Sequence, residues 1–395
     1  MKICFILPHF YPYVGGAEKI FYDLTEGLVR RGHEVRVISS ATGTGHMGVC
    51  RIDADGGILE TGSAFSEEEK ALQVRYCGWK EFFGHPLPAA SDMEESIRWA
   101  DVVHTSTFTP APPVSRLARK YHKPSVLTVH EVHGMKWYWV DNFIRSTAFL
   151  VYEWYVCTRP FDLYHAVSEA TRQDYFSFCG KRDVRRVYNA DEMDPEMELD
   201  PEFDIHRFFD VEPEKRIFLY YGRPGKTKGV NVYEKALLML GAMGEDLDNV
   251  RFCFALGAEP AGPRAEFVKS IEKNGLGDIV RIRGSLSRAA LGSCILQADY
   301  VVVPSVTEGF GLSALEACQM GKKLIVSDGG ALPEVVYGDI LQFRNRDAKD
   351  LAEKLLQVIH KGEGAFQKIP PKQFTYEQMI GGIEQLYFEL IKERA

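Results

Sequence analysis

The chain has 395 residues, of which 45% are hydrophobic, 26% charged and 12% aromatic. This composition excludes a disordered chain, a collagen-like chain and a small disulfide scaffold, and the length predicts roughly two to three domains with sizeable cores. The formal net charge is −8. Non-specific nucleic-acid binding usually needs a basic excess, so we expect no nucleic-acid partner.

The eight cysteines favour a reducing compartment. None of them stands in a C-x-x-C pair and several lie in apolar runs, which predicts buried, reduced thiols and no structural zinc. The apolar start, residues 3–7, is too short for a signal sequence, and no unbroken apolar run exceeds five residues. We therefore expect a cytoplasmic protein, with attachment to a membrane surface left open.

Strand and helix patterns alternate along the N-terminal part. A buried strand at 3–7 is followed by a loop with Gly15 and Gly16 and by an amphipathic helix at 17–31. Gly32 ends that helix. Further strands are predicted at 34–38, 102–103, 125–129 and 163–167. This alternation predicts a parallel sheet with helices on both faces.

The segment 191–212 breaks the pattern. It holds ten acidic residues and one basic residue, so it carries −9 of the net charge and leaves the rest of the chain at +1. We predict an acidic linker there. The acidity is thus local, and it does not argue against basic patches elsewhere.

A second strand–helix alternation follows the acidic segment. Its strands are predicted at 217–221, 251–256, 280–283, 300–303 and 324–327, and its helices at 230–240, 264–273, 288–297, 312–320 and 348–360. A final helix is predicted at 376–392. The predicted fold class is α/β, with two Rossmann-like domains facing each other across a cleft, as suits a two-substrate enzyme.

The predicted domains are an N-terminal, acceptor-side domain at 1–190, the linker at 191–212 and a C-terminal, nucleotide-sugar-binding domain at 213–365. Residues 366–395 form a C-terminal helical segment, for which packing back on the N-terminal domain is one arrangement.

The most informative loop spans Pro304 to Glu316. It follows a hydrophobic strand and opens a helix, and its glycines, Gly309 and Gly311, allow a ligand to approach the backbone closely. The amides and dipole of the helix start favour a phosphate. Glu308 and Glu316 can accept hydrogen bonds from sugar or ribose hydroxyls. The alternative is a pair of solvated glutamates around a tight turn.

Three further sites are weaker when taken alone. The turn from Gly222 to Gly229 holds Arg223 and Lys228 before a helix, which suits a diphosphate but also a plain polar turn. The Gly15-Gly16 pair could admit a phosphate or an acceptor. His130 ends a strand, where doubly wound folds place their chemistry, although a lone histidine is usually structural.

Two D-x-D triplets, Asp53/Asp55 and Asp246/Asp248, resemble the cation-binding triplet of sugar transferases with a different fold. Neither triplet follows a clear strand, so we predict no metal site.

In order and spacing, these residues resemble the family 4 retaining glycosyltransferases of the GT-B fold. The resemblance rests on Gly15-Gly16, on His130, on the Gly-Arg-x4-Lys-Gly pattern of Arg223 and Lys228, and on the E-x7-E pattern of Glu308 and Glu316. Ser168 to Tyr175 and the domain-closing Asn189 also match. The resemblance departs from the family at Asp191, which should not be carried over, at Gly257-Ala258-Glu259-Pro260, and at the shortened turn around Gly338.

The resemblance implies a retaining, metal-independent transferase that moves a hexose-type sugar from a UDP- or GDP-linked donor to an acceptor hydroxyl, with no cofactor. It implies catalytic roles for His130, Arg223, Lys228 and Glu308 and an acceptor-side role for Gly15. The residues that it assigns to the donor are Gly16, Gly309, Phe310, Gly311, Leu312 and Glu316. A non-hydrolysing nucleotide-sugar epimerase and a catalytically silent nucleotide-sugar-binding subunit are the alternatives.

The acceptor is left open as a sugar, a small alcohol or a lipid-linked molecule. The segment 114–123 holds four basic residues and no acid. It could touch an anionic membrane, as a basic N-terminal helix does in membrane-associated relatives, although a solvated helix face is the more ordinary interpretation. The aromatic-rich segment 137–155 is more typical of a core helix than of a lipid contact.

Overall fold

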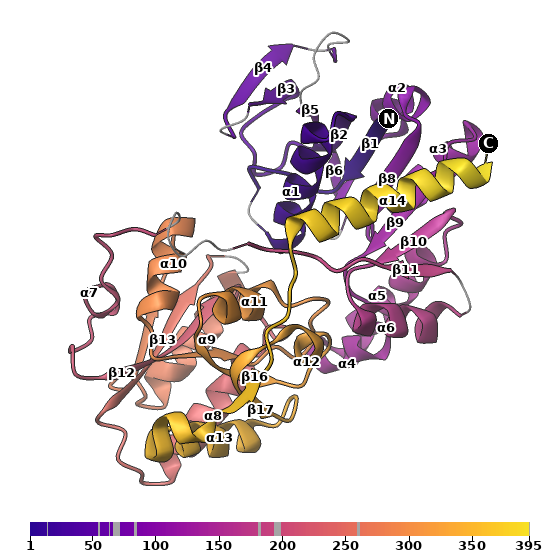
Figure 1. Cartoon of the computed structure of the whole chain (residues 1–395). Helices are drawn as coiled ribbons and strands as arrows, with labels where there is room; N and C mark the ends of the chain where they lie inside the picture. Colours follow the sequence, from indigo (N-terminus) through magenta and orange to yellow (C-terminus); the bar gives the residue numbers. More distant parts are fainter. Residues whose placement is uncertain are drawn as a thin grey trace. The chain divides into compact units, whose positions relative to one another are not determined.

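The computed structural model describes residues 1–395 apart from 14, 54–55, 63, 66–71, 83–84, 181–182, 193–198, 259–260 and 395. The chain folds into two compact units (Figure 1). The first unit comprises residues 1–190 together with 374–395, and the second comprises residues 191–373.

The first unit is an α/β structure around a large sheet. Its strands are β1 (Lys2–Leu7), β2 (Glu34–Ser40), β3 (Gly48–Ile52), β4 (Ile58–Gly62), β5 (Leu72–Cys77), β6 (Lys80–Phe82), β7 (His85–Leu87), β8 (Val102–Ser106), β9 (Ser125–Val129), β10 (Leu163–Ala166) and β11 (Val184–Arg186). Its helices are α1 (Gly16–Arg30), α2 (Ala90–Trp99), α3 (Ala111–Lys120), η1 (Gly134–Lys136), α4 (Trp137–Val140), α5 (Phe143–Cys157), α6 (Glu169–Cys179) and α14 (Tyr376–Arg394).

The described strands of this sheet run in the order β11-β10-β9-β8-β1-β2-β5-β3-β4. The pairings from β11 to β5 are parallel, and β3 runs antiparallel to β5 and to β4. The strand order reverses between β1 and β8, which is the switch point where open α/β sheets bind ligands. The hairpins between β2 and α2 carry no strong period in the sequence, and we did not expect them.

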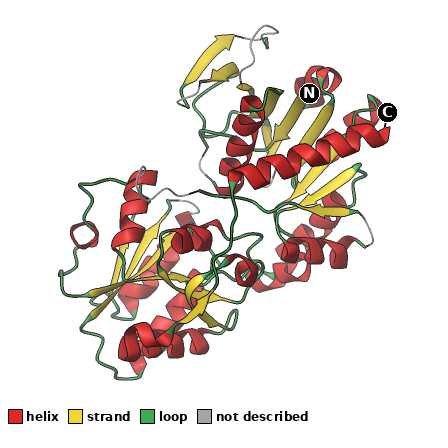
Figure 2. Ribbon diagram, viewed as in Figure 1, coloured by secondary structure: helices red, strands yellow, loops and turns green. Residues whose placement is uncertain are grey.

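The second unit repeats the architecture (Figure 2). Its strands are β12 (Arg216–Gly222), β13 (Val250–Leu256), β14 (Val280–Arg283), β15 (Tyr300–Val303), β16 (Lys323–Ser327), β17 (Gly338–Phe343) and β18 (Gln367–Ile369). Its helices are α7 (Ile205–Phe209), α8 (Val230–Ala242), α9 (Ala261–Lys273), α10 (Arg288–Gln297), α11 (Leu312–Gln319), α12 (Leu332–Val335), α13 (Ala348–Lys361) and η2 (Gly362–Ala365).

In the second sheet the described strands run β14-β13-β12-β15-β16-β17-β18, and only the pairing of β18 with β17 is antiparallel. The order reverses between β12 and β15. The loops that follow these two strands therefore lie at this unit's switch point.

The predicted linker at 191–212 differs from what the structure shows. Its described residues belong to the second unit, where Ile205, Phe209 and Val211 are buried against the sheet. The Asp200 carbonyl accepts a hydrogen bond from the Ser293 hydroxyl on α10. The sequence did not indicate these three core side chains, because the few apolar residues of this acidic segment follow neither a helical nor a strand period.

The C-terminal helix α14 packs on α1 within the first unit. Its inward face buries Met379, Ile383 and Tyr387. Arg31, just after α1, pairs with Glu377 and Glu384 of α14. Residues 366–373, which we placed with this helix, belong to the second unit and include β18.

The described cysteines are all free thiols, and each is buried except Cys179, which is half-buried. Burial raises the pKa of the Cys4 and Cys253 thiols to about 12. The predicted reduced, buried cysteines are therefore confirmed. Among the described residues, no helix combines the length and the apolar composition that crossing a bilayer requires.

Candidate active site

Two loops that are far apart in sequence meet at the switch point of the second unit. The loop after β12 contains Thr227, whose carbonyl accepts hydrogen bonds from the backbone amides of Val306 (2.8 Å) and Thr307 (3.3 Å) in the loop after β15. Gly229 has φ +72°, and a Cβ on it would lie 1.8 Å from the Pro304 carbonyl oxygen. Only glycine permits this close approach, so the Gly229 position holds the two loops together.

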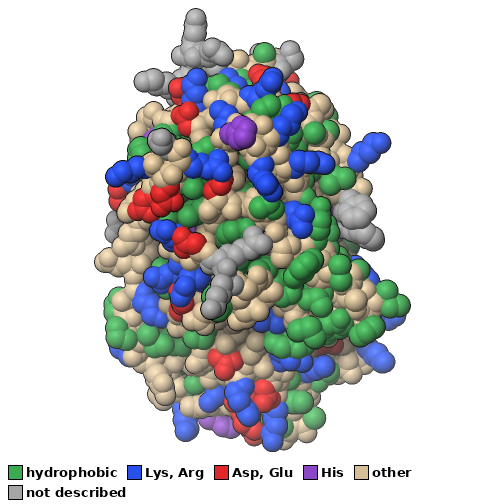
Figure 3. Space-filling model, turned by 90° about the vertical axis from the view of Figure 1, so that its right-hand side faces the viewer, with side chains coloured by type: hydrophobic (Ala, Val, Ile, Leu, Met, Phe, Trp, Pro, Cys, Tyr) green, Lys and Arg blue, Asp and Glu red, His purple; other side chains and the backbone are tan. Residues whose placement is uncertain are grey.

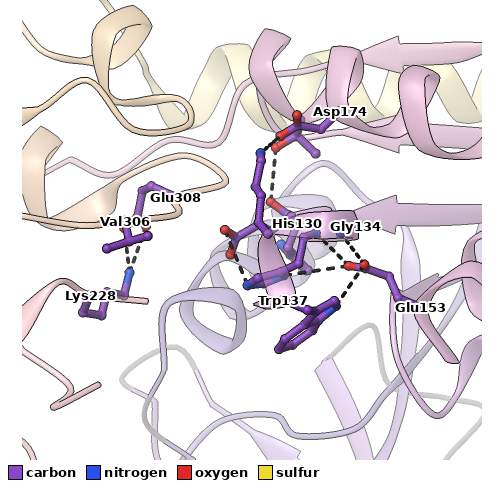
Figure 4. Close-up of polar contacts among 12 residues, drawn as sticks. His130, Gly134, Trp137, Glu153, Asp174, Lys228, Val306 and Glu308 are labelled. Atoms are coloured by element: carbon purple, nitrogen blue, oxygen red, sulfur yellow. Dashed lines mark hydrogen bonds and ion pairs between the residues drawn. The ribbon is translucent and has the colours of Figure 1, made fainter. Parts of the chain in front are cut away.

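The side chains of these loops form an ion pair. Lys228 Nζ lies 2.9 Å from Glu308 Oε1 and 2.8 Å from Oε2 (Figure 4). Arg223 is exposed in the same loop. The pKa of the Tyr220 hydroxyl is raised by burial and by the Glu308 charge, and the Arg223 charge opposes this rise. The three predicted residues Arg223, Lys228 and Glu308 thus gather at one sheet edge.

Helix α11 starts beside this ion pair. Its N-cap is Gly311, in the left-handed region at φ +102°, and no side chain caps the helix. Gly330, at φ +55°, lies against the loop from the other side, since a Cβ there would be 2.2 Å from the Glu308 carbonyl oxygen. The predicted donor residues Gly309, Phe310 and Leu312 lie in this loop and at the first position of α11. An uncapped helix start of this kind suits a phosphate.

Glu316 is buried on α11 and is ion-paired. Arg288, at the start of α10, places Nη1 3.1 Å from Glu316 Oε1 and Nη2 3.1 Å from Asp191 Oδ1. Asp191 is fully buried. Asp191 departs from the family pattern and Arg288 belongs to no motif, yet the structure places both beside Glu316. The Glu316 carboxylate therefore has a fixed orientation.

In the first unit, Gly15 is the N-cap of α1 and Gly16 is its first residue, on the carboxyl side of β1. Gly15 has extended backbone, and a Cβ on it would lie 2.1 Å from the Glu18 carboxylate. The helix starts without a side-chain cap. This pair therefore forms a second uncapped helix start at the switch point of the first sheet.

His130 follows β9, and its ring packs edge-on against Phe21 with centroids 5.4 Å apart. Its backbone carbonyl accepts a hydrogen bond from Thr171 on α6. Burial lowers the pKa of His130 to about 3, with a further contribution from His165. Among the described residues, no partner hydrogen-bonds Nε2. The ring is therefore a neutral imidazole at a strand end, with one buried nitrogen that is unpartnered among the described residues.

The family comparisons agree with this arrangement. A model described as Glycosyl transferases group 1 matches residues 202–369, and one described as Glycosyltransferase Family 4 matches residues 14–190. Together the two models span most of both units.

The chain is a glycosyltransferase of the group 1 and family 4 type.

Individual relatives extend this result. The glycosyltransferase is 26% identical over 339 residues to the GDP-mannose:cellobiosyl-diphosphopolyprenol alpha-mannosyltransferase of Xanthomonas oryzae, a match that covers 83% of this chain and 79% of that protein. A shorter match, 33% identical over 128 residues, covers 30% of this chain and 36% of an uncharacterized glycosyltransferase from Methanocaldococcus jannaschii.

Solved structures show the fold. The glycosyltransferase aligns with the sucrose-phosphate synthase of Thermosynechococcus elongatus at a TM-score of 0.74 and 18% identity, over 100% of both chains. This similarity confirms the predicted GT-B fold of two Rossmann-like domains.

Glu153 on α5 is a residue of the glycosyltransferase that no sequence motif revealed. Its carboxylate accepts hydrogen bonds from the amides of His133 and Gly134 and from the Trp137 indole (Figure 4). It thereby fixes the loop that follows His130. Glu153 is the only acidic residue in the apolar helix α5. A single acid among apolar side chains indicates a buried, hydrogen-bonded role, and this was the available signal in the sequence.

The described aspartates of the D-x-D triplets, Asp53, Asp246 and Asp248, lie outside helices and strands. Asp246 Oδ1 accepts a hydrogen bond from the Asp248 amide at 3.0 Å, and Asp53 accepts one from the Gly57 amide. Asp55 and Glu259-Pro260 lie outside the described residues. A different trio, His46, Cys50 and Glu60, has side-chain atoms within 4.8 Å of one another on and before the β3–β4 hairpin. The expectation of a metal-free reaction stays a prediction.

Proposed function

We propose that this glycosyltransferase moves a hexose-type sugar from a nucleotide diphosphate sugar to an acceptor hydroxyl, with retention at the anomeric carbon and without a metal ion. The observation that carries the proposal is the convergence of the loops after β12 and β15 at the switch point of the second sheet. Their contents, two cations, a carboxylate and an uncapped helix start, match the parts of such a donor.

The diphosphate requires positive charge, because its leaving oxygen gains negative charge as the glycosidic bond breaks. Arg223 and Lys228 supply two cations, and the amides at the start of α11 add oriented dipoles. We assign these groups to the diphosphate. Preorganised donors of this kind stabilise a developing charge better than water does.

The ion pair between Lys228 and Glu308 suggests how the site changes on binding. In this structure Glu308 holds the Lys228 ammonium at 2.8 Å. We propose that the diphosphate takes Lys228, which frees the Glu308 carboxylate for sugar hydroxyls. Glu316, oriented by Arg288, would then accept hydrogen bonds from the ribose hydroxyls.

We assign His130 to the donor sugar near the reacting carbon. Because its pKa is lowered to about 3, the imidazole is neutral at physiological pH. We assign its buried Nε2, which has no hydrogen-bond partner among the described residues, to a hydroxyl of that sugar. In the retaining scheme that the family resemblance implies, the acceptor hydroxyl attacks on the face that the leaving phosphate vacates, and its proton passes to that phosphate. No protein nucleophile is required.

The proposed acceptor class rests on the name of a relative. The Xanthomonas relative is named for a diphosphopolyprenol acceptor, and we propose a lipid-linked acceptor ahead of a free sugar or a small alcohol. A cytoplasmic location stays a prediction. The epimerase alternative receives no support from the family models, which describe transferases.

The stereochemistry and the metal requirement can be tested together. The chain is incubated with UDP- or GDP-linked α-hexoses, in the presence of EDTA, with either a diphospholipid-linked sugar or a simple alkyl glycoside as acceptor. Proton NMR of the product then reports the anomeric configuration. We expect an α-linked product at an undiminished rate, and a β-linked product or loss of activity on chelation would contradict the proposal.

A further inference from the structure

Three side chains with metal-binding atoms meet at the hairpin of β3 and β4 in the first unit (Figure 1). They are His46, just before β3, Cys50 on β3 and Glu60 on β4. An imidazole nitrogen, the thiol sulfur and a carboxylate oxygen all lie within 4.8 Å of one another. In the part of the chain that the structure describes, no other three histidine, cysteine, aspartate or glutamate residues bring their ligand atoms this close.

Strand pairing sets the positions of Cys50 and Glu60. The two residues lie directly opposite each other in the antiparallel pair of β3 and β4. Residues paired in this way point to the same face of the sheet, with Cβ atoms about 4.5–5.5 Å apart. On its other side β3 pairs with β5, where Cys50 lies opposite Val74. The backbone therefore holds two of the three side chains together without any ion.

The turn before β3 orients His46. The Thr44 hydroxyl accepts a hydrogen bond from the His46 amide at 3.1 Å and donates one to the Ala41 carbonyl at 2.9 Å. The His46 ring packs beside the buried ring of Tyr76 on β5, with centroids 6.0 Å apart. This leaves Nδ1 3.4 Å from Glu60 Oε1. The imidazole thus already points at the carboxylate.

The spacing of these atoms suits a tetrahedral zinc ion. Zinc bonds of about 2.0–2.2 Å to nitrogen and oxygen place those two ligands about 3.3–3.5 Å apart, as His46 Nδ1 and Glu60 Oε1 are. A zinc-bound sulfur lies about 3.6 Å from either, so a closure of about 1 Å completes the geometry. The Glu60 side chain is 62% exposed. It is therefore free to make this movement, and an ion can enter from solvent.

We propose that His46, Cys50 and Glu60 bind a zinc ion. Imidazole, thiolate and carboxylate are the ligands that zinc takes, whereas magnesium and calcium prefer oxygen alone. Binding releases the thiol proton of Cys50, because the thiolate is the ligand. A water molecule supplies the fourth ligand, as at other zinc sites with three protein ligands. The inference goes beyond the proposed function, since none of the three residues is assigned to the donor or to catalysis.

The ion would act on stability. Among the described strands, β4 lies at the end of the first sheet and pairs with β3 alone. An edge strand has a neighbour on one side only, so a metal link from Glu60 to Cys50 and His46 strengthens the sheet where its pairing is weakest. The expectation of no structural zinc rested on the absence of a C-x-x-C pair, and a site with one cysteine contains no such pair.

The test is isothermal titration of zinc into the full, reduced chain, after chelator treatment and repurification. Cobalt(II) then serves as a spectroscopic substitute for zinc. The ligand variants are His46→Gln, Cys50→Ser and Glu60→Gln. The matched controls change one residue of each type elsewhere in the chain, namely His360→Gln, Cys179→Ser and Glu214→Gln. Circular dichroism melts of the metal-free proteins verify folding, and Glu60→Gln stays informative if the buried Cys50→Ser does not fold.

We expect one zinc ion per native chain. On the face drawn in Figure 3, histidine side chains, in purple, are few and lie apart from one another, so this face offers little to adventitious zinc. Changes beside a metal ligand typically weaken binding 10- to 100-fold. Each ligand variant should therefore lose at least about 100-fold in affinity, and the controls should bind as the native chain does.

Two further readouts identify the ligands and the role of the ion. The cobalt complex should show a cobalt–thiolate charge-transfer band that Cys50→Ser lacks and Cys179→Ser keeps. Zinc should raise the Tm of the native chain and of the controls by mass action, with no sugar donor present. The ligand variants should show little or no rise.

Four results would overturn the proposal. The first is that the native chain binds no zinc. The second is that His46→Gln and Glu60→Gln bind zinc as tightly as the native chain, which would place the ion elsewhere. The third is a cobalt complex without a thiolate band, or with a band that only Cys179→Ser removes. The fourth is an unchanged native Tm at saturating zinc, which would deny the ion a structural role.

Discussion

Gly330 lies against the backbone of Glu308 and has φ +55°. Both facts restrict this position to glycine, because an L-residue is strained at that φ and a Cβ would lie 2.2 Å from the Glu308 carbonyl oxygen. The position of the proposed catalytic carboxylate thus depends on a residue in another loop.

Gly330→Ala should lower both stability and activity. The left-handed conformation costs roughly 1–2 kcal/mol, and the clash must displace Glu308. Gly321→Ala is the matched control, because Gly321 has φ +66° with nothing within 4 Å of an added Cβ. We expect both variants to melt earlier in calorimetry, but only Gly330→Ala to lose turnover. Equal turnover in the two would separate Gly330 from the site.

Arg223 and Lys226 are two exposed cations of one loop, and only Arg223 belongs to the predicted pattern. Arg223→Ala removes a charge-assisted contact worth roughly 1.5–3 kcal/mol, so we expect kcat/KM to fall about 10- to 100-fold. Lys226→Ala should stay near the native value. Steady-state kinetics decide the point, and an unchanged kcat/KM in Arg223→Ala would refute the diphosphate assignment.

At the residue scale, the sequence could predict those site residues that lie in a loop directly after a strand. Lys228 and Glu308 lie in loops after buried strands, and sheet topology brings such loops together. The sequence could not predict the pairing of Arg288 with Glu316, because Arg288 starts a helix like many surface cations. Nor could it predict that Gly330 touches Glu308, since that contact needs the tertiary arrangement of three loops.

At the scale of elements, a buried polar chain crosses the first sheet from α14. The Tyr387 hydroxyl contacts His104 Nδ1 on β8, and His104 Nε2 lies 2.6 Å from Thr128 Oγ1 on β9. Thr128 Oγ1 lies 2.8 Å from His165 Nδ1 on β10, and His165 Nε2 lies 2.9 Å from the Val187 carbonyl. Burial lowers the pKa of both histidines, that of His165 to about 4.

Tyr387→Phe should destabilise the first unit by roughly 1–3 kcal/mol, because His104 then keeps a buried ring nitrogen without its partner. The matched control is Tyr376→Phe on the same helix, whose hydroxyl accepts from Lys19 at a partly solvated site. We expect the control to cost less than about 1 kcal/mol. Urea unfolding measures both, and equal losses would mean that the buried bond contributes no more than a surface one.

The buried histidines also predict a pH dependence. An unfolded histidine takes up a proton below a pKa of about 6.5, whereas folded His165 does so only near 4. Between these values the unfolded state holds more protons, so stability is full above about pH 6.5 and falls as the pH falls. The slope is about 1.4 kcal/mol per pH unit for each such histidine.

Calorimetry of the native chain from pH 7 down to 5 should therefore show a falling Tm. His165→Gln should flatten this dependence, while a change of the exposed His360 to Gln should leave it as it is. A slope in His165→Gln as steep as the native one would contradict the assignment.

At the scale of the whole molecule, both halves of the chain were predictable as doubly wound sheets. Strands such as Ser125–Val129 and Val280–Arg283 occur where the pattern placed them, because buried parallel strands are continuous apolar runs. The acidic segment was not predictable in this way, since Ile205 and Phe209 are few and lack a period. The prediction of a core helix for 137–155 was wrong at α5 for the opposite reason, because large apolar side chains of this helix are exposed. An apolar composition indicates burial without indicating which surface covers the helix.

The central claim is that this glycosyltransferase binds a nucleotide diphosphate sugar at the loops after β12 and β15. The most direct measurement is a thermal-shift panel of UDP-, GDP- and ADP-linked sugars, with EDTA present, on the native chain, Arg223→Ala and Lys226→Ala. A ligand that binds only the folded chain stabilises it by about 2.7 kcal/mol at a hundredfold excess over Kd. We predict that at least one donor raises the Tm of the native chain and of Lys226→Ala, and that Arg223→Ala loses most of that shift. A panel in which no donor raises the native Tm, or in which Arg223→Ala responds as the native chain does, would contradict the claim.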